Sequence, residues 1–360
     1  MNKLVYEIPL IKFNIDTSKF PRTRYQGSKA KIVDWILTSV KDMEINTILD
    51  AFGGTGVVGY HYKKLRKKVV YNDLMKFNSI IATALIENKD TFLLDDEVDD
   101  LLKQNIKEVP SFIQENYNNI FYLDEENRWL DEMIYKIRKI PNKYKQAIAW
   151  FAIIQGCIIK RPYNLFHRAN LSIRTSVVKR SFGNKKTWDN SFELYFRKFV
   201  HEANAAVFDN GYNNVVLNQN AIKINPNDYK IDTVYIDTPY ISEKGIGTDY
   251  YDFYGFLEGM VDYDNWGEKI LTKYKHKPII GRGIKDWTSK DKIFDSFDKL
   301  FAQYKDQQLI ISYRDDGIPS IAELEEILKK YKSDISEIYS TDYKYVFSTK
   351  HTKEVLIIAR

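Results

Sequence analysis

Hydrophobic and polar residues follow one another in the first part of the chain in a pattern that predicts helix, strand, helix and strand. A strand is expected near the N-terminus, and residues 29–40 then place apolar side chains at helical spacing. Residues 46–52, NTILDAF, form a nearly continuous apolar run that is typical of a buried parallel strand. Residues 56–65 have helical spacing again, and residues 67–73 predict a second strand. The last three segments therefore predict a βαβ unit of a doubly wound sheet.

The pattern changes over residues 78–201, where helical segments rich in polar and charged residues replace the alternation of strands and helices. Strand patterns return afterwards at residues 213–221, 232–240, 277–283 and 308–314, and residues 343–360 predict an antiparallel hairpin. Helices fit between these strands at residues 290–304 and 320–331. We therefore expect an α/β fold with a doubly wound, mostly parallel sheet. Residues 1–77 and 202–360 would form its core domain, and residues 78–201 a mainly helical insertion.

Composition narrows the class of protein. Hydrophobic residues make up 44% of the 360 positions, and 29% charged residues argue against a membrane protein and against wholesale disorder. The longest apolar run, residues 147–159, is too short to span a membrane, and no signal sequence opens the chain. Cys157 is the only cysteine, which excludes an intrachain disulfide. We expect a cytoplasmic protein. We also expect no metal site, because the five histidines and the cysteine lack metal-ligand spacing.

A glycine-rich loop, DAFGGTG, follows the first apolar strand. Gly54, Gly56 and Gly59 match the glycine spacing of dinucleotide-binding loops, and Asp73 stands where such proteins carry an acid that binds the ribose. The acid before the glycines, Asp50, favours S-adenosylmethionine instead. In that class of enzyme the pattern D/E-x-F-x-G-x-G leaves room for an amino acid and a ribose and has no pyrophosphate to hold. On this loop alone, a dinucleotide cofactor and a turn without a ligand remain alternatives.

Two further motifs change this picture. The sequence YIDTPY ends an apolar strand late in the chain, and RYQGSK stands before the glycine loop. Together with the loop they resemble the adenine-N6-specific DNA methyltransferases of the Dam-like group, whose cofactor motifs precede a catalytic D/N/S-P-P-Y/F/W and whose N-terminal motif reads R-Y-x-G-x-K. The order of N-terminal motif, glycine loop, long insertion and catalytic motif also matches, and the resemblance spans most of the chain. Thr238 departs from the pattern, since proline is usual at this position.

The resemblance implies a seven-stranded, mostly parallel sheet of the S-adenosylmethionine-dependent methyltransferase type with an antiparallel C-terminal hairpin. It implies S-adenosylmethionine as the cofactor and site-specific transfer of its methyl group to the N6 amine of a flipped-out adenine in double-stranded DNA. Asp50 would engage the methionine ammonium and Asp73 the ribose hydroxyls, and Asn220 stands where relatives often carry an acid near the adenine ring of the cofactor. The full set of expected cofactor-binding residues is Arg24, Tyr25, Gly27, Lys29, Asp50, Phe52, Gly53, Gly54, Gly56, Asp73 and Asn220.

The expected catalytic residues are Asp237, Thr238, Pro239 and Tyr240. The lone pair of an exocyclic adenine amine is delocalised into the ring, so methyl transfer requires acceptors that localise it and aim it. By resemblance, the carboxylate of Asp237 and the main-chain carbonyl of Thr238 accept the two N–H groups. Tyr240 would stack on the base, and Pro239 would keep the turn rigid. Because threonine also has a main-chain carbonyl, we expect the chemistry to survive the departure at Thr238.

The insertion carries the residues expected to bind DNA. Its segment 160–186 holds eight Lys and Arg residues and no acid, a segregation that predicts a positive face. Tyr163, Phe166 and Trp188 are candidates for stacking or wedging, and His167 for packing or hydrogen bonding. We expect contacts with phosphates and base edges from Lys160, Arg161, Tyr163, Asn164, Arg168, Arg174, Lys179, Arg180, Lys185 and Lys186.

The segment after the catalytic motif, residues 241–258, combines glycines with aromatic residues. It predicts either a mobile lid over the flipped base or a rigid wall, and Tyr250, Tyr251 and Tyr254 are its candidate contacts.

These observations lead to one main hypothesis and several alternatives. The main hypothesis is a monomeric, site-specific DNA adenine-N6 methyltransferase that is the modification partner of a restriction endonuclease, or that acts alone. Cytosine-N4 methylation and RNA adenine methylation are close alternatives, because related tetrapeptides serve several planar amines. A catalytically inactive DNA-binding relative is a further alternative, with Thr238 as its cause, and a dehydrogenase is the most remote.

Overall fold

The computed structural model of the protein describes residues 18–103, 106, 108–176, 185–242, 247, 249–281, 285–339 and 353–360. In this part of the chain, seven strands form one sheet in the order β3-β2-β1-β4-β6-β9-β8. The first five strands in this order pair in parallel, whereas β9 lies antiparallel to both β6 and β8. The predicted fold class is therefore confirmed. The strands are β1 (Thr47–Asp50), β2 (Lys68–Asn72), β3 (Val215–Leu217), β4 (Thr233–Ile236), β6 (Gln308–Arg314), β8 (Ile335–Tyr339) and β9 (Glu354–Ala359).

Alternate residues of the central strands point into two separate apolar cores, as expected for a sheet covered on both faces. In β1, Ile48 belongs to one core and Leu49 to the other. Because both faces are covered, every residue of β1 and β4 is buried. On the face of Ile48 lie α1 (Val33–Ser39) and α2 (Val57–Lys64), and on the face of Leu49 lie η4 (Ala221–Lys223), α14 (Lys285–Thr288), α15 (Lys290–Gln303) and α16 (Ile321–Leu328).

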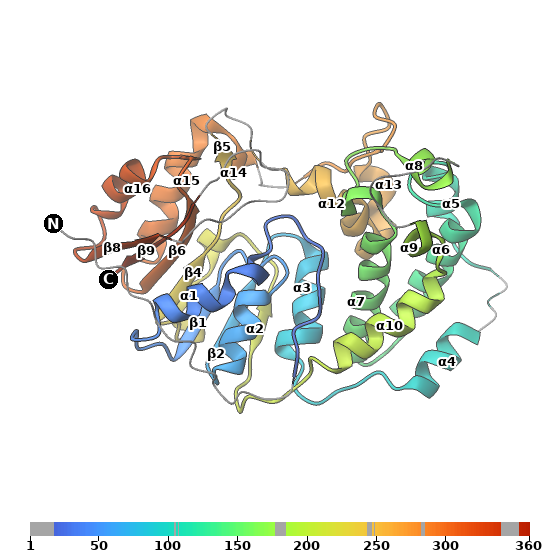
Figure 1. The fold of residues 1–360 in the computed structure, drawn as a ribbon, viewed down its shortest axis with the longest axis horizontal. Helices are drawn as coiled ribbons and strands as arrows, with labels where there is room; N and C mark the ends of the chain where they lie inside the picture. Colours follow the sequence, from blue (N-terminus) through green and yellow to red (C-terminus); the bar gives the residue numbers. More distant parts are fainter. Residues whose placement is uncertain are drawn as a thin grey trace.

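A helical region lies beside the sheet, and its helix α3 is next to the sheet (Figure 1). It contains α3 (Lys76–Ala82), the π-helix η2 (Thr83–Glu87), α4 (Asp95–Lys103), α5 (Phe112–Asn116), α6 (Asp124–Arg138), α7 (Lys143–Ile159), η3 (Pro162–Asn164), α8 (Leu171–Thr175), α9 (Lys185–Asp189) and α10 (Phe192–Asn204). Chain from beyond Tyr240 packs here as well, as α12 (Tyr250–Val261), η5 (Tyr263–Asn265) and α13 (Trp266–Lys269). The ring of Trp266 lies 5.0 Å from the rings of both Phe112 and Tyr117.

Helix α7 is the centre of this region. It is apolar on nearly all sides, which is typical of a helix surrounded by other elements, and it is buried from Ala147 to Ile159. The side chain of Asn142 caps it by accepting hydrogen bonds from the N–H groups of Tyr144 and Lys145. Even so, no helix among the described residues has the length and apolar content that crossing a membrane requires. One continuous core runs from α2 and α3 into α7 and α12, so the helical region packs directly against one face of the sheet.

The remaining elements are short: η1 (Lys29–Lys31), α11 (Pro226–Tyr229), β5 (Ile241–Ser242) and β7 (Gly317–Ile318). The strands β5 and β7 pair antiparallel with each other, outside the main sheet.

Three strand predictions differ from the structure. The strand expected at residues 277–283 is wrong for the described positions, where Ile270 and Ile279 form a single bridge that closes a loop instead. The strand β8, which pairs with β9, lies upstream of the predicted hairpin, and residues 340–352 of that region lie outside the described residues. Residues 18–28 contain no strand, and the rest of the expected N-terminal strand lies outside the described residues.

Candidate active site

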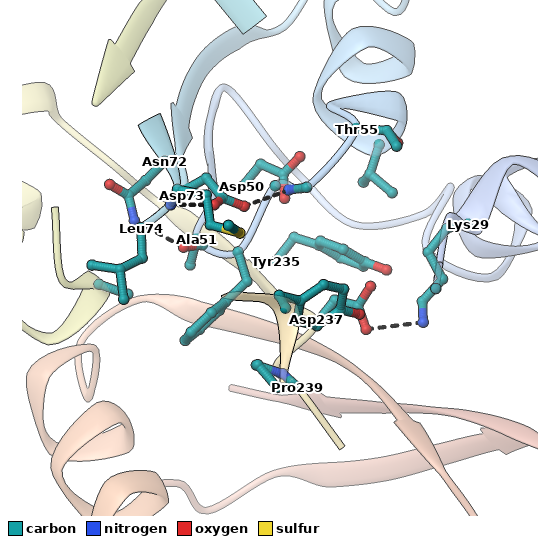
Figure 2. A pocket seen from close by; sticks show the side chains of 18 of the residues that line it. Lys29, Asp50, Ala51, Thr55, Asn72, Asp73, Leu74, Tyr235, Asp237 and Pro239 are labelled. Carbon is teal, nitrogen blue, oxygen red and sulfur yellow. Dashed lines mark hydrogen bonds and ion pairs between the residues drawn. The ribbon is translucent and has the colours of Figure 1, made fainter. Parts of the chain in front are cut away.

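A pocket opens at the carboxyl ends of β1, β2 and β4, where the three sequence motifs meet (Figure 2). Neighbouring parallel strands end at one edge of the sheet, so Asp50, Asp73 and Asp237, each at or just after the end of its strand, face the same space. The predicted residues that line this pocket are Tyr25, Gly27, Lys29, Asp50, Phe52, Gly53, Gly54, Asp73, Asn220, Asp237 and Pro239. The predicted residues outside its lining are Arg24, Gly56, Thr238 and Tyr240.

Two of those four residues have a clear local explanation. Arg24 is exposed and lies outside the pocket lining, so its expected contact with the cofactor stays a prediction. Gly56 has a φ of 77° and is the N-cap of α2, a left-handed conformation that glycine adopts without strain. It therefore shapes the glycine loop from outside the pocket.

Asp50 ties the glycine loop to the helix that follows it. Its Oδ2 accepts a hydrogen bond of 3.0 Å from the N–H of Gly59, inside the first turns of α2. Burial raises the pKa of Asp50 to about 7, although the hydrogen bond from Gly59 opposes the shift. The carboxylates of Asp237 and Asp73 add to the increase. Asp50 is therefore a buried acid that a cationic ligand would help to ionise.

Asp73 holds the opposite side of the loop. Its Oδ2 accepts from the N–H of Gly54 at 2.8 Å, and its Oδ1 accepts from the N–H of Met75 at 2.7 Å. Burial raises the pKa of Asp73 to about 6, and these two hydrogen bonds limit the increase. Asp73 thus orients the glycine loop as well as facing the pocket.

Gly53 allows the loop to approach β2 closely. A methyl group at this position would lie 2.0 Å from the ring of Tyr71, a residue of β2. The hydroxyl of Tyr71 donates to the main-chain carbonyl of Gly54 at 2.7 Å. Any side chain at Gly53 would therefore displace Tyr71 and disturb the loop that it supports.

The N-terminal motif joins the pocket to α12 through stacked tyrosines. The ring of Tyr25 lies parallel to those of Tyr254 and Tyr250, at centroid distances of 4.5 and 5.6 Å. The N–H of Gln26 donates to the hydroxyl of Tyr254 at 2.8 Å. Asp249 caps the helix by accepting from the N–H groups two and three residues ahead. Because Tyr251 and Tyr254 are buried, the described part of residues 241–258 resembles the rigid wall more than the mobile lid.

Lys29 lies at the centre of a buried group of charges. Its Nζ is 2.9 Å from Oδ1 of Asp237, 3.0 Å from Oε1 of Glu354 and 2.7 Å from the hydroxyl of Tyr240. Burial alone would lower the pKa of Lys29, but the two carboxylates raise it above its usual value. Burial raises the pKa of Asp237, Lys29 opposes that shift, and Glu354 adds to it. Lys29 therefore stays charged and holds one oxygen of the expected catalytic carboxylate.

The structure gives Tyr240 a different environment from the one expected. Its hydroxyl donates to Oδ1 of Asp237, and its ring packs edge-on against Tyr313 at 5.5 Å. Since the ring does not line the pocket, stacking on a base would require this side chain to turn.

Three of the basic residues expected to bind DNA are buried instead. Lys160 and Arg174 both pair with Glu126, at 2.8 and 2.7 Å. The guanidinium of Arg161 donates to the main-chain carbonyls of Leu165 and Arg168. Because a buried charge needs partners inside the protein, these side chains support the loop that follows α7 and are not free for phosphates.

The remaining candidates in that segment divide by exposure. Phe166 and Trp188 are buried and pack in the core, so they are wrong as wedges. Tyr163, Arg168, Lys185 and Lys186 are exposed, and Asn164 is half-buried. Tyr163 and Asn164 both have positive φ values, 63° and 59°, a strained conformation for two successive side chains. Lys179 and Arg180 lie outside the described residues.

Sequence reasoning missed a basic loop at residues 270–280. The N–H of Leu271 donates to the carbonyl of Pro278, and Lys273, Tyr274 and Lys275 are exposed at its tip. Figure 1 shows this loop, after α13, at the same end of the molecule as α8. Three lysines without an acid in KYKHK are a signal for such a loop, but the sequence pattern places this segment in the sheet domain.

The first turn of α12 anchors the basic loop 270–280 and the loop that follows α7. The side chain of Asp252 accepts from His276 in the loop 270–280, at 3.0 Å. The next residue, Phe253, accepts from the N–H of Phe166 through its carbonyl at 2.9 Å, and its ring contacts that of His167. The two loops therefore lie near each other and near Tyr250, which lines the pocket.

Pocket residues that the motifs did not indicate include Asn72, Gln219, Tyr235 and Trp287. Asn72 donates to the carbonyls of Ala51 and Gln219, both at 3.0 Å, and so links the ends of β1 and β3 across β2. Its position beside Asp73 in the sequence is the only local signal for this role.

The order of the sheet, its antiparallel C-terminal strands and the glycine loop over the ends of β1 and β2 define a methyltransferase of the S-adenosylmethionine-dependent fold class. The family model of the D12 class N6 adenine-specific DNA methyltransferases matches residues 25–277. The chain belongs to this family and is an adenine-specific DNA methyltransferase. The predicted family, enzyme class and DNA substrate are thereby confirmed.

Curated relatives are similar over most of the chain. The type II methyltransferase M2.HphI of Haemophilus parahaemolyticus is 28% identical over 351 residues, which cover 94% of this chain and 96% of the relative. The type II methyltransferase M.NlaIII of Neisseria lactamica is 21% identical, over 89% of this chain and 91% of the relative. The modification methylase LlaI of Lactococcus lactis subsp. lactis is 25% identical over 89% of this chain, but the match spans only 51% of the relative.

Proposed function

We propose that this enzyme takes its methyl group from S-adenosylmethionine, held in the pocket at the ends of β1, β2 and β4. The observation that carries this proposal is the charge of the pocket. Asp50, Asp73 and Asp237 line it, and among the described lining residues the single cation, Lys29, lies between two carboxylates. A negative pocket suits a ligand with an ammonium and a sulfonium group and repels the pyrophosphate of a dinucleotide.

The residues of the pocket have distinct roles in this proposal. Asp50 would hold the ammonium, Asp73 the ribose hydroxyls, and Asn220 with Phe52 would border the adenine ring. When bound, the cofactor supplies an electrophilic methyl group on a positively charged sulfur. The hydrogen bonds that Asp50 and Asp73 accept from the N–H groups of Gly59 and Gly54 hold the loop in shape before any ligand arrives.

Asp237 is the proposed acceptor for the adenine amine. Its Oδ1 already accepts from Lys29 and Tyr240, whereas its Oδ2 has no hydrogen-bond donor among the described residues. One N–H of the amine would donate to Oδ2 and the other to the main-chain carbonyl of Thr238. Together these acceptors would localise the nitrogen lone pair and aim it at the methyl group.

We assign methyl transfer to residues 1–77 and 202–360 and DNA recognition mainly to residues 78–201, together with the basic loop 270–280. This assignment is supported by the exposed side chains of Tyr163, Arg168, Lys185 and Lys186. It is also supported by the contacts that the loop 270–280 and the loop after α7 both make with α12. Phosphate contacts would come from the lysines and arginines, and base contacts from Tyr163 and Asn164.

We further propose that the enzyme is a monomeric, cytoplasmic partner of a restriction endonuclease that acts at the same DNA site. The type II naming of the relatives M2.HphI and M.NlaIII supports the pairing with a restriction endonuclease.

Transfer of labelled methyl groups from S-adenosylmethionine to unmethylated genomic DNA, followed by nucleoside analysis, tests the proposal. We expect label in N6-methyladenosine of DNA and none in cytosine or RNA, and sequencing of the same DNA would then reveal the site. A protein that binds NAD and not S-adenosylmethionine, or that labels another base, contradicts the proposal.

A further inference from the structure

Glu354 is a fully buried acid at the start of β9, far in sequence from all three motifs. It lies opposite Arg314 in the pairing of β9 with β6, and the hydroxyl of Ser312 on β6 donates to its Oε1. Burying a carboxylate is costly unless charge and hydrogen bonds compensate it. Lys29 supplies a compensating positive charge, because its Nζ lies 3.0 Å from the same oxygen.

Lys29 therefore connects Glu354 to the site of methyl transfer. Its ammonium lies between Oε1 of Glu354 and Oδ1 of Asp237, at 3.0 and 2.9 Å, and its side chain is 4% exposed. The hydroxyl of Tyr240 contacts all three charged groups: it donates to Asp237, accepts from Lys29 at 2.7 Å and lies 3.4 Å from Oε1 of Glu354. One lysine thus contacts both buried carboxylates.

We propose that Glu354 is a positioning residue for methyl transfer, which holds Lys29 so that Oδ1 of Asp237 is fixed and Oδ2 is presented to the adenine amine. This inference rests on the proposed role of Asp237. Glu354 does not line the pocket and acts through Lys29.

The charge of the group explains why a second carboxylate is useful. During transfer, positive charge moves from the sulfur of the cofactor to the N6 atom of adenine. Glu354 adds a second carboxylate to the pair of Lys29 and Asp237, beside the place where N6 becomes positive. Without the charge of Glu354, the stabilisation of the transition state would be weaker.

The matched test compares Glu354→Gln with Glu337→Gln, the same change on the neighbouring strand β8. Glutamine keeps the size of Glu354 and one acceptor oxygen but removes its charge. We expect Glu354→Gln to lower the single-turnover rate of methyl transfer by about ten- to a hundredfold, with cofactor affinity within about twofold of wild type. We expect Glu337→Gln to have the wild-type rate. Equal rates for Glu354→Gln and wild type would overturn the inference.

The pH profile separates an electrostatic role from a structural one. Asp237 is surrounded by Lys29, Glu354, Tyr240, Tyr235, Tyr250 and Asp50. Burial and the charge of Glu354 raise the pKa of Asp237. Removal of that charge should therefore shift the acidic limb of the rate profile to lower pH. A slower enzyme with an unshifted limb would mean that Glu354 only supports the fold.

A double-mutant cycle with Lys29→Met tests whether Glu354 acts through Lys29. Without the lysine, the two buried carboxylates repel each other, so adding Glu354→Gln to Lys29→Met should leave the rate unchanged or raise it. Additive losses would contradict the inference. The wild-type enzyme and Asp237→Ala in the same assay keep this result separate from the proposed function, which fails if Asp237→Ala methylates DNA at the wild-type rate.

Discussion

The ammonium of Lys29 and Oδ1 of Asp237 lie 2.9 Å apart, although one residue belongs to the N-terminal motif and the other follows β4. Asp237 lines the pocket, and its second oxygen has no hydrogen-bond donor among the described residues. In the proposed mechanism, Lys29 therefore holds the acceptor of the adenine amine in place before DNA binds.

The first prediction concerns that acceptor. Asp237→Asn should lower the methyl transfer rate by about a hundredfold or more, because an amide is a weaker acceptor and its NH₂ group would oppose the N–H of adenine. Cofactor affinity should change little, and both quantities are measured by single-turnover kinetics and calorimetry. Asp228→Asn, at an exposed turn, is the control and should behave as wild type. An active Asp237→Asn enzyme would show that another group accepts the amine.

A second prediction concerns the pH dependence of cofactor binding. Burial raises the pKa of Asp50 to about 7, so this acid is charged above that pH and neutral below it. Because a bound ammonium favours the charged form, affinity for S-adenosylmethionine should be full above pH 7 and fall as the pH drops, by up to about tenfold per pH unit. Calorimetry across this range measures the effect. The Asp50→Asn variant should bind S-adenosylmethionine weakly. Its affinity should depend less on pH until the pH falls to the pKa of Asp73, which is about 6. Equal slopes for both proteins would exclude Asp50 as the group involved.

The third prediction contrasts two arginines six residues apart. Arg174→Ala breaks a buried pair with Glu126 and should lower the free energy of unfolding by about 3 kcal/mol, as measured by denaturant titration. Arg168→Ala removes an exposed side chain and should change this free energy by less than about 0.5 kcal/mol. It should instead weaken DNA binding. If Arg174→Ala weakened DNA binding and Arg168→Ala lowered the free energy of unfolding, then Arg174 would reach DNA and Arg168 would not.

The fourth prediction concerns the basic loop 270–280. If Lys273 and Lys275 contact phosphates, replacing both with alanine should reduce the slope of log affinity against log salt by about two. Loss of affinity should be similar for cognate and unrelated DNA, because phosphate contacts carry no sequence information. Alanine at Lys329 and Lys330, which are exposed at the end of α16, is the matched control and should leave the slope unchanged. An unchanged slope in the Lys273 and Lys275 variant would place the loop away from DNA.

The sequence by itself determined the elements whose signals are local. The apolar run of β1, the glycines and the helical spacing of α2 lie within one stretch of chain, and a strand-loop-helix unit forms there because hydrogen bonding and apolar periodicity are short-range properties. For the same reason the three motifs were recognisable, and the parallel order of their strands required their acidic residues to meet at one edge of the sheet.

Only the tertiary structure decided which charged residues are available for function. Lys160, Arg161 and Arg174 have the sequence pattern of a DNA-binding face, yet they are buried beside Glu126 and the main-chain carbonyl of Phe121, which an earlier segment supplies. Glu354 has no local signal at all, because its role depends on the placement of β9 between β6 and β8. Burial and the pairing of charges depend on segments far apart in the chain, and no local pattern records them.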